Sequence, residues 1–521
     1  MAPLSVDVAI LGSGFGGSIT ALVLARLGLR VVLVDRASHP RFAIGESSTP
    51  VADYVLADLA RRYDLARLAP LAKYGTWQRA YPRIVCGIKR GFSYFSIPAD
   101  APFAPRGDHA NELLVAASSD DEHSDTHWLR SDVDAFLAAE AQEAGVELFD
   151  RTEVSVDRGG HEWQLDGKRL EQDVHIRARF VIDATGEAGV LQRTLGIGNE
   201  AERLATNSRA LFAHFADMRP WDDVLASAGS AVDDHPFYCD HAALHHLFDE
   251  GWMWQLRFNS GVTSAGFAID CAHSPLDNSL PIEQEWSRLM NRYPSVAGQF
   301  ERARIIAPAG GLRRTGRLQR LAARMVGDNW ALLPNTAGFI DPLHSTGIAQ
   351  TLCGIERLAG VFQSHWGKPS LGLHFTSYEA TVRRELLLVD KLVSGCYLAR
   401  RQFRLFAAFS MLYFVAATTY ERRRHAGEIQ PGAAFLCADD ADYCRAVDHC
   451  YGELCRLLAT RDMTNAESSK THYRDTNERV SDADVAAFER LVADRMAPFN
   501  TAGLCDPIAR NMYRHTTAPR D

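Results

Sequence analysis

Lysine is scarce in this chain of 521 residues, because only six of its 56 basic residues are Lys and the other 50 are Arg. One of the six, Lys89, lies within the apolar run IVCGIKRGFSYF at residues 84–95. A buried Lys shifts its pKa readily, whereas the guanidinium of Arg stays protonated. The placement of Lys89 therefore raises the question of a chemical role that Arg does not fill.

A basic tract and a long apolar segment are both missing. The net charge is −9 and the basic residues form no tract, so we expect no nucleic-acid partner. The longest apolar run, LFAAFSMLYFVAA at residues 405–417, is too short to span a bilayer. It predicts a buried helix, with a role at a membrane surface or in a ligand channel as the alternative.

Closely spaced cysteine pairs are missing as well. The chain has ten Cys without paired short spacings, which indicates reduced thiols. The first strand-like run begins at Val6 and leaves no room for a signal peptide. We therefore expect a cytoplasmic protein with no transmembrane segment.

Three segments combine an apolar strand with a polar or glycine-containing turn, at residues 6–35, 179–186 and 330–347. Their scattering along the chain indicates an α/β fold in which one Rossmann-like nucleotide-binding domain is interrupted by insertions. With 46% apolar residues, the chain can bury a large core. We predict three parts: a discontinuous nucleotide-binding domain at 1–204 and 306–370, an inserted sheet-rich substrate region at 205–305, and a helical C-terminal region at 371–521.

A glycine motif typical of dinucleotide binding follows the first strand. GSGFGG places Gly12, Gly14 and Gly17 in the order G-x-G-x-x-G, directly before a predicted helix. The glycines permit a tight turn, and the N–H groups that begin the helix face a pyrophosphate. Asp35 ends the second strand, where a carboxylate accepts hydrogen bonds from ribose hydroxyls. The motif predicts a dinucleotide but does not separate FAD from NAD.

Three later segments resemble the FAD-dependent aromatic hydroxylase and halogenase superfamily: HWLRSDVDAFL at 127–137, DATG at 183–186 and PNTAGFIDPLHSTGI at 334–348. The resemblance covers most of residues 6–360 and implies an FAD-binding domain of the glutathione-reductase type. It assigns further FAD contacts to Arg41, Glu46, Arg130, Asp183, Asn335, Asp341, Gly347 and Ile348. In one departure, Pro334-Asn335 stands where the superfamily usually has Gly-Asp, and an amide hydrogen-bonds a ribityl hydroxyl without carrying charge.

Three motifs are similar to those of the halogenase branch. RFAIGESSTP at 41–50 has the branch's Glu46 and Pro50. GWMWQLRF at 251–258 resembles W-x-W-x-I-P with Arg257 in place of the proline, and two core tryptophans on a strand are the alternative interpretation. DPLHSTGI at 341–348 resembles the D-P-L-x-S-T-G segment that lies against the flavin in halogenases.

The last of these motifs implies a halide site. The resemblance assigns it to the backbone amides of Thr346 and Gly347, with Ser345 beside them. Halide requires oriented N–H donors and a favourable dipole, and amides at the amino end of a helix provide both. An ordinary helix cap is the alternative interpretation.

CGIKRGFSY, the segment around Lys89, resembles the lysine segment of flavin halogenases that act on free phenols. If residues 84–95 form one strand, Lys89 shares a face with Gly87 and Gly91, which predicts open space on both sides of it. The resemblance implies that Lys89 receives hypohalous acid and presents it to the substrate. Its ammonium can donate to that acid, or its neutral amine can form a chloramine. A surface Lys is the alternative, and Arg90 is predicted to be structural.

Histidine replaces a carboxylate beside the predicted halide site. Tryptophan halogenases carry a Glu at the position of His344, so the resemblance implies a ring that is electron-rich by itself, such as a phenol. We interpret His344 as packing against the flavin region, with a role as proton acceptor as the alternative. A separate cluster contains four histidines: His235, His241, His245 and His246. It lacks the Glu that accompanies a metal-binding pair of histidines on a helix, so we expect no metal there.

Together these motifs predict an FADH2- and O2-dependent halogenase that chlorinates or brominates a small, electron-rich aromatic substrate. Chloride or bromide is the expected co-substrate. Because the chain shows no second nucleotide motif, a separate flavin reductase is expected to supply the reduced FAD. The alternatives are a flavin monooxygenase that hydroxylates an aromatic ring, a reductase of unsaturated lipids, and a flavin-binding protein without chemistry.

Overall fold

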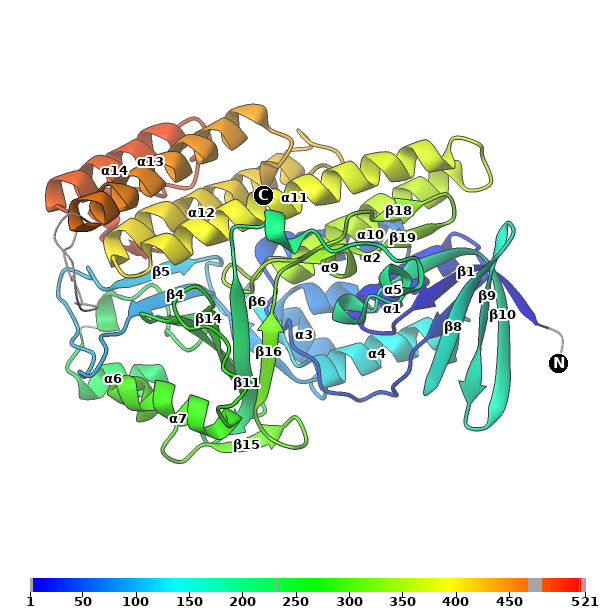
Figure 1. The fold of residues 1–521 in the computed structure, drawn as a ribbon, viewed down its shortest axis with the longest axis horizontal. Coiled ribbons are helices and arrows are strands. Elements are labelled where there is room, and N and C mark those ends of the chain that lie inside the picture. The colour runs from blue at the N-terminus through cyan, green and yellow to red at the C-terminus, as the bar shows by residue number, and fades with distance from the viewer. Residues whose placement is uncertain (1–2, 231, 467–479, 515, 517–521) are drawn as a thin grey trace.

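The computed structural model describes residues 3–230, 232–466, 480–514 and 516. These residues form two large sheets with helices packed against them, as Figure 1 shows. One sheet contains the first strand of the chain, and the other is built largely from the middle of the chain. Four long helices, α11 to α14, lie together along one side of the molecule (Figure 1).

The first sheet has eight strands in the order β18-β19-β10-β1-β2-β7, and the hairpin β8–β9 pairs with β10 through β9. Its strands are β1 (Leu4–Leu11), β2 (Val31–Val34), β7 (Glu147–Phe149), β8 (Thr152–Gly159), β9 (Glu162–Arg169), β10 (Gln172–Asp183), β18 (Val326–Gly327) and β19 (Trp330–Leu332). The strands β7, β2, β1, β10 and β19 are parallel. This order confirms the predicted α/β nucleotide-binding fold.

Burial along this sheet follows its sequence pattern. β2 reads VVLV and is buried at all four residues, as expected for a parallel strand covered on both faces. β10 alternates between buried and exposed residues where β9 pairs with it, and its last four residues are all buried. The polar turns that follow β1 and β10 therefore lie at the carboxyl edge of the parallel strands, where doubly wound sheets bind their ligands.

The second sheet has nine strands in the order β15-β11-β14-β13-β12-β4-β5-β21, with β16 also paired to β11. Its strands are β4 (Gly91–Ser96), β5 (Glu112–Ala116), β11 (Ser208–Ala216), β12 (Ala243–Leu247), β13 (Gly251–Arg257), β14 (Thr263–Asp270), β15 (Arg304–Ala307), β16 (Arg313–Arg317) and β21 (Met512–Tyr513). Strands β4, β5 and β21 come from outside residues 205–305, so distant segments build one sheet. The boundaries of the inserted region at residues 205 and 305 therefore stay a prediction.

The C-terminal part is helical, with α10 (Thr346–His365), α11 (Leu371–Ala399), α12 (Phe403–His425), α13 (Ala441–Ala466) and α14 (Asp482–Met496). Among the described residues, α12 is the one helix long and apolar enough to cross a membrane. However, 78% of its most apolar window is buried inside the protein. The prediction of a buried helix at residues 405–417 is therefore confirmed.

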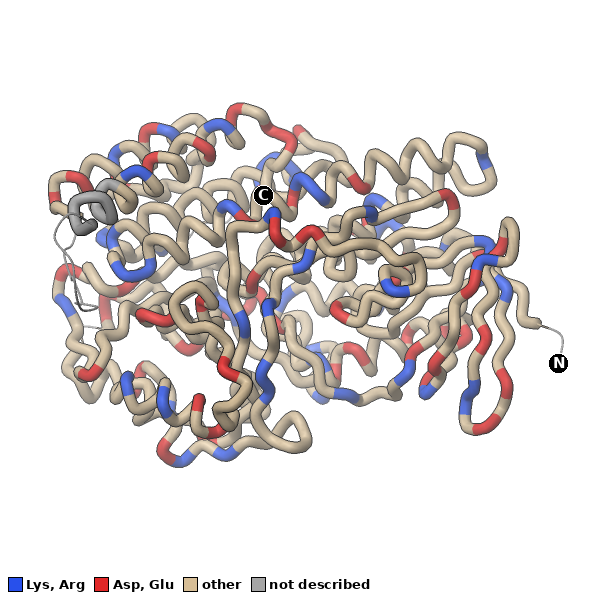
Figure 2. Tube along the Cα trace, viewed as in Figure 1, with Lys and Arg blue, Asp and Glu red and all other residues tan. Residues whose placement is uncertain are grey.

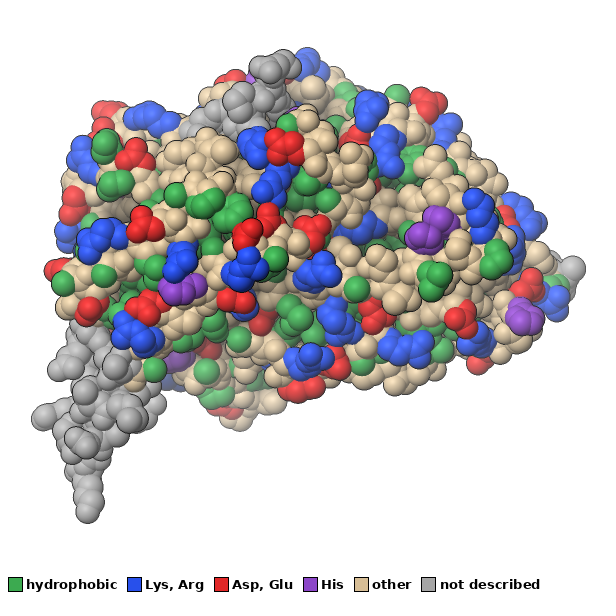
Figure 3. All heavy atoms as spheres, turned by 90° about the horizontal axis from the view of Figure 1, so that it is seen from above, with side chains coloured by type: hydrophobic (Ala, Val, Ile, Leu, Met, Phe, Trp, Pro, Cys, Tyr) green, Lys and Arg blue, Asp and Glu red, His purple; other side chains and the backbone are tan. Residues whose placement is uncertain are grey.

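The remaining helices and strands connect these layers. They are α1 (Phe15–Arg26), α2 (Pro50–Arg62), α3 (Tyr74–Ala80), α4 (Arg130–Glu143), α5 (Val190–Thr194), α6 (Trp221–Ser227), α7 (Ile282–Arg292), α8 (Pro294–Ala297), α9 (Pro334–Ala337), β3 (Cys86–Lys89), β6 (Asp125–Trp128), β17 (Arg320–Leu321) and β20 (Gly338–Phe339). Figure 2 shows basic and acidic residues interspersed along the chain, and Figure 3 shows the same mixture on one face.

Candidate functional site

The glycine turn between β1 and α1 is tightly packed. Gly12 has a φ of +95°, and a Cβ there would come within 2.8 Å of the carbonyl oxygen of Ala184. A Cβ on Gly17 would overlap the carbonyl oxygen of Gly12, so the first turn of α1 approaches the turn as closely as glycine permits. At Gly14 a Cβ would instead meet the paired side chains of Asp134 and Arg130, with Oδ2 of Asp134 at 3.4 Å and Nη2 of Arg130 at 3.5 Å. This cradle fits an anionic group such as a pyrophosphate.

Charged side chains surround the cradle. Arg130 binds Asp134 through two hydrogen bonds of 2.9 Å, and Asp134 accepts a further one from the N–H of Phe15. Asp35 accepts hydrogen bonds from the N–H of Ser13 at 2.8 Å and from Arg41 at 2.9 Å. Burial acts to raise the pKa of Asp35, but Arg41 and the N–H donors hold it below its usual value. The residues at this edge of the sheet therefore fit a dinucleotide such as FAD.

Two predicted FAD contacts, Asp183 and Asp341, are buried and hold turns of the chain itself. Asp183 accepts hydrogen bonds from the N–H groups of Thr185 and Leu191. Asp341 accepts hydrogen bonds from the hydroxyls of Ser208 and Tyr397, at 2.7 and 2.9 Å. Burial raises the pKa of Asp341 to about 6. These carboxylates fix the turns that precede α5 and α10.

The amino end of α10 is open, as a halide site requires. Ser345 caps the helix in a left-handed conformation with φ +53°, and Thr346 begins it. A Cβ on Gly347 would meet no heavy atom within 4 Å. Among the described residues, none accepts a hydrogen bond from the N–H of Thr346 or Gly347. The start of α10 therefore offers two N–H donors without an acceptor among the described residues, together with the positive end of the helix dipole.

Lys89 is completely buried, so the alternative of a surface Lys is wrong. Its Nζ donates a hydrogen bond to the carbonyl oxygen of Ser48 and lies 4.1 Å from the centre of the Phe92 ring. Burial lowers the pKa of Lys89 to about 7, although the carboxylates of Asp125 and Asp53 act to raise it. Both the ammonium and the neutral amine are therefore populated near neutral pH.

One short segment contacts both Lys89 and α10. The hydroxyl of Ser345 lies 3.0 Å from that of Ser47, and the next residue, Ser48, accepts the hydrogen bond from Lys89. The side chain of Glu46, just before them, lies 2.9 Å from His214 on the second sheet. The segment that resembles the halogenase motif therefore brings the predicted halide site and the predicted catalytic Lys into one region of the interior.

The prediction of open space on both sides of Lys89 is wrong. Residues 84–95 form two strands rather than one, because β3 pairs with β6 whereas β4 pairs with β5 and β12. A Cβ on Gly87 would overlap the carbonyl oxygen of Arg257, and one on Gly91 would overlap that of Val115. These glycines allow neighbouring strands to approach closely. Arg90, between the strands, forms an ion pair of 2.7 Å with Asp121, as expected for a structural residue.

A second lysine connects the region of Lys89 to the surface. Lys73 Nζ lies 2.9 Å from Asp53 and 2.9 Å from Asp125, which is opposite Lys89 in the β3–β6 pair. Burial raises the pKa of Asp53 well above its usual value, and Lys73 acts in the opposite direction. Asp53 and Lys73 line an outer cleft of about 330 Å³ that also includes His425. Of the two carboxylates that influence Lys89, Asp53 therefore lines an outer cleft, and Asp125 is connected to that cleft through Lys73.

A small cavity of about 30 Å³ is lined by Phe92, whose ring also contacts Lys89 Nζ at 4.1 Å. Its walls come from the start of α2, from β4 and β5, and from α12; they include Thr49, Val51, Phe92, Val115, Tyr413, Phe414, Thr418, Glu421 and Thr516. Sequence reasoning missed Asp125 and Glu421. Glu421 is the single acidic residue of α12, which was a visible signal, whereas nothing local showed that Asp125 faces Lys89.

Comparison with known proteins decides the family. A family model described as tryptophan halogenase matches residues 123–404, more than half of the chain. The chain belongs to the flavin-dependent halogenase family. A second model, for FAD-dependent oxidoreductases, matches residues 7–205, which contain the glycine turn.

Named relatives of this halogenase cover most of its length. Monodechloroaminopyrrolnitrin halogenase PrnC of Pseudomonas fluorescens is 28% identical over 89% of this chain and 84% of its own. Tetracycline 7-halogenase of Kitasatospora aureofaciens is 29% identical over 78% and 73%. The crystal structure of halogenase PltM in complex with phloroglucinol and FAD superposes with a TM-score of 0.82. It has 25% identity and covers 97% of this chain and 99% of that one. The protein is thus an FAD-dependent oxidoreductase that halogenates.

Other residues of the predicted halogenase motifs lie in the core. Trp252 and Trp254 are buried on β13 and donate hydrogen bonds to Tyr397 and Ser264, at 3.0 and 3.2 Å. Both tryptophans are therefore core residues of the second sheet. Arg257, which stands in place of the motif's proline, forms an ion pair of 2.5 Å with Asp240.

His344 of the halogenase is buried and packs against an aromatic ring, while its predicted packing against the flavin region stays a prediction. Its ring stacks on Tyr413 with 4.4 Å between the ring centres, and burial lowers its pKa to about 3. A neutral imidazole in van der Waals contact with an aromatic ring supports a packing role at neutral pH.

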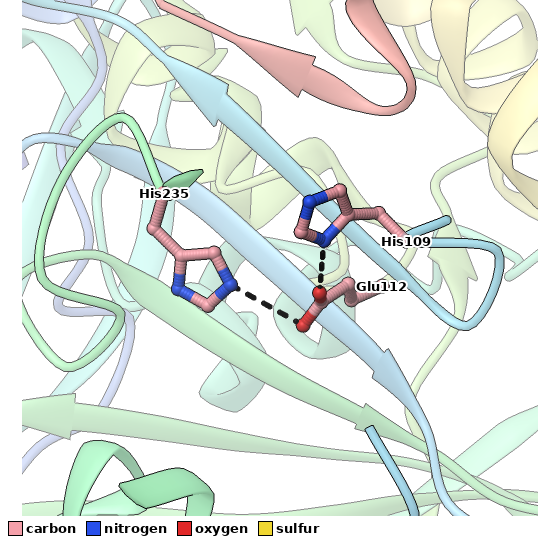
Figure 4. Close-up of side chains that lie close together, drawn as sticks. All are labelled: His109, Glu112 and His235. Atoms are coloured by element: carbon pink, nitrogen blue, oxygen red, sulfur yellow. Dashed lines mark hydrogen bonds and ion pairs between the residues drawn. The ribbon is translucent and has the colours of Figure 1, made fainter. Parts of the chain in front are cut away.

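Three side chains form a cluster at strand β5 of the second sheet of the halogenase: His109 and Glu112, which are three residues apart, and the distant His235 (Figure 4). His109 Nδ1 lies 2.5 Å from Glu112 Oε1, and His235 Nε2 lies 3.4 Å from Glu112 Oε2. Their ligand atoms lie within 4.8 Å of one another. His245 belongs to strand β12 and stacks on Tyr94, so the four histidines of this stretch do not share one helix. That the protein holds no metal stays a prediction.

Proposed function

We propose that this halogenase uses reduced FAD, O2 and chloride or bromide to halogenate an electron-rich, phenol-type ring by way of hypohalous acid that passes to Lys89. The observation that carries the proposal is the contact of one segment, Ser47–Ser48, with both the α10 start and the buried ammonium. Bound FAD would supply the oxidation of halide to hypohalous acid. The protein's own residues bind halide, position the acid and exclude water.

Halide binding is assigned to α10. The N–H groups of Thr346 and Gly347 are directed donors without a formal cation, so they hold an anion that must still react. Ser345, in its left-handed conformation, sets the direction in which the helix starts. We assign FAD contact to the remaining predicted residues: Gly12, Gly14, Gly17, Asp35, Arg41, Glu46, Arg130, Asp183, Asn335, Asp341 and Ile348.

Lys89 is assigned the transfer step. When the ring attacks, the halogen–oxygen bond breaks and hydroxide leaves, and the Lys89 ammonium donates the proton that converts hydroxide to water. A pKa of about 7 makes that ammonium a much better proton donor than a solvent-exposed Lys. The alternative, in which the neutral amine forms a chloramine, requires the same burial.

Relatives support an electron-rich ring. PltM is described in complex with phloroglucinol, a benzene ring with three hydroxyls. The names of the two relatives indicate an aminopyrrolnitrin and a tetracycline as their substrates. Oxygen or nitrogen on a ring supplies electrons to the attacked carbon, which compensates for the Glu that His344 replaces. A separate flavin reductase is proposed as the source of reduced FAD.

The test is a halogenation assay with FAD, a flavin reductase, chloride or bromide, and a panel of phenols and anilines. We expect a halogenated product from the parent protein and a loss of at least 10²-fold in kcat for Lys89→Ala. Lys168→Ala, on an exposed face of β9, is the control and should retain full activity. A Lys89→Ala variant as fast as the parent would contradict the assigned role, and halide-independent hydroxylation would indicate a monooxygenase.

A further inference from the structure

Glu421 is a buried carboxylate without a hydrogen-bond partner at Oε1 among the described residues. Its side chain is 2% exposed, and it lines a cavity together with Phe92, the ring that lies 4.1 Å from Lys89 Nζ. A long ion pair joins this Oε1 to His425 Nε2 one turn later on the helix, at 3.8 Å. A buried charge without close donors costs stability, and such groups occur preferentially where function uses them.

The threonine hydroxyls in the cavity wall form hydrogen bonds with the backbone. Thr418 donates to the carbonyl oxygen of Phe414 at 2.9 Å, and Thr516 donates to that of Ala116 at 2.6 Å. Thr49 accepts the N–H of Ala52 as the cap of α2. The rest of the wall is mainly apolar, with Val51, Phe92 and Phe414 among its side chains. A ligand in this cavity would therefore find an aromatic wall and one carboxylate as its acceptor.

We propose that Glu421 is a second catalytic residue of this halogenase, whose carboxylate accepts a hydrogen bond from the hydroxyl or amino group of the substrate ring. The inference rests on the proposed function. Tryptophan halogenases carry a Glu where this chain has His344. In this proposal, Glu421 on α12 supplies the carboxylate that is missing at position 344. The cavity of about 30 Å³ holds little more than a water molecule, so side chains of its wall must move when a ring enters.

The carboxylate would act on the ring electronically. As the carbon–halogen bond forms and the halogen–oxygen bond breaks, the ring hydroxyl gives its proton to Glu421 and becomes a carbonyl. The departing hydroxide takes a proton from Lys89 and leaves as water. The amine of Lys89 then removes the proton from the halogenated carbon, and Glu421 returns its own proton to the ring oxygen. Hypohalous acid and arene thus give haloarene and water, with both residues restored.

His425 links the Glu421 carboxylate to the outer cleft. Its side chain is 30% exposed, lines the outer cleft and packs edge-on against Tyr54 at 4.5 Å. Glu421 therefore lies between the inner cavity and the outer cleft, with His425 as its neighbour on the side of the cleft. An ionised Glu421 is the form that accepts the substrate hydrogen bond.

The test compares Glu421→Gln with the parent on two substrates, a phenol and its O-methyl ether. The ether keeps the ring but has no O–H to donate. With the phenol, we expect kcat to fall about 10²-fold in the variant. With the ether, the parent should already be slow and the variant should match it to within about twofold. Aniline and N,N-dimethylaniline form the corresponding arm for an amino group.

Three controls separate the possible failures. Glu428→Gln changes an exposed Glu that pairs with Arg422 and should leave both rates unchanged. The thermal midpoint of Glu421→Gln should equal or exceed that of the parent, because the amide removes a buried charge. If the parent halogenates the phenol and Glu421→Gln does so equally fast, this inference is overturned while the proposed function stands. If the parent halogenates no ring under any halide, the proposed function itself fails.

Discussion

The ammonium of Lys89 has one backbone acceptor, Ser48, and no carboxylate within ion-pair distance among the described residues. Burial therefore dominates and brings the pKa down to about 7, against the weaker pull of Asp125. Arg at this position would stay protonated in the same surroundings. The scarcity of Lys in the sequence thus pointed to a residue whose protonation state is adjustable.

This pKa predicts a pH limb in the rate. If the ammonium donates the proton to the leaving hydroxide, kcat is high below pH 7 and falls as the pH rises through about 7. Asp125→Asn removes a negative charge that favours the ammonium, so the limb should move to lower pH. The measurement is a pH–kcat profile of both proteins.

Asp121→Asn is the matched control, because Asp121 pairs with Arg90 at the surface and the limb should not move. A rate that increases through pH 7 would instead favour the chloramine route. A limb that stays in place in Asp125→Asn would show that this carboxylate does not act on Lys89.

The turns and helices of the site were predictable from local sequence, and the strands around Lys89 were not. Thr49-Pro50 begins α2 with a capping hydroxyl and a proline at the first position, a pattern visible in the sequence. The alternation through residues 84–95 looked like one strand, because periodicity does not reveal partners. Only the fold shows that the direction of pairing changes at Arg90, between β3 and β4.

The close packing of these strands gives a prediction about stability. Gly87→Ala places a methyl group against the carbonyl oxygen of Arg257 in β13, and we expect a loss of about 2–3 kcal/mol in the free energy of unfolding. Gly452→Ala is the matched control, because a Cβ there meets nothing within 4 Å on an exposed helix surface. It should gain up to about 1 kcal/mol. Denaturant unfolding measures both, and a neutral Gly87→Ala would contradict the packing described.

At the scale of the molecule, the site is assembled from segments that the sequence keeps far apart. Lys89 comes from the end of β3, the proposed halide site from α10, and part of the cavity wall from α12 and Thr516. The family motifs predicted the first two, because each is a contiguous stretch. The roles proposed for Glu421 and Asp125 rest on contacts between distant segments, which a single sequence does not display.

Halide oxidation and ring substitution are assigned to different parts of this assembly, so they should be separable. Lys89→Met leaves the glycine turn and the start of α10 intact, and should therefore continue to form hypohalous acid while losing the halogenated product. The acid should then escape and react with a scavenger in solution. The measurement is halide-dependent oxidation of a thioether probe in the presence of catalase, which removes hydrogen peroxide. As the control, Lys168→Met should release no more oxidant than the parent. If Lys89→Met releases no oxidant, Lys89 is needed to form the hypohalous acid rather than to receive it.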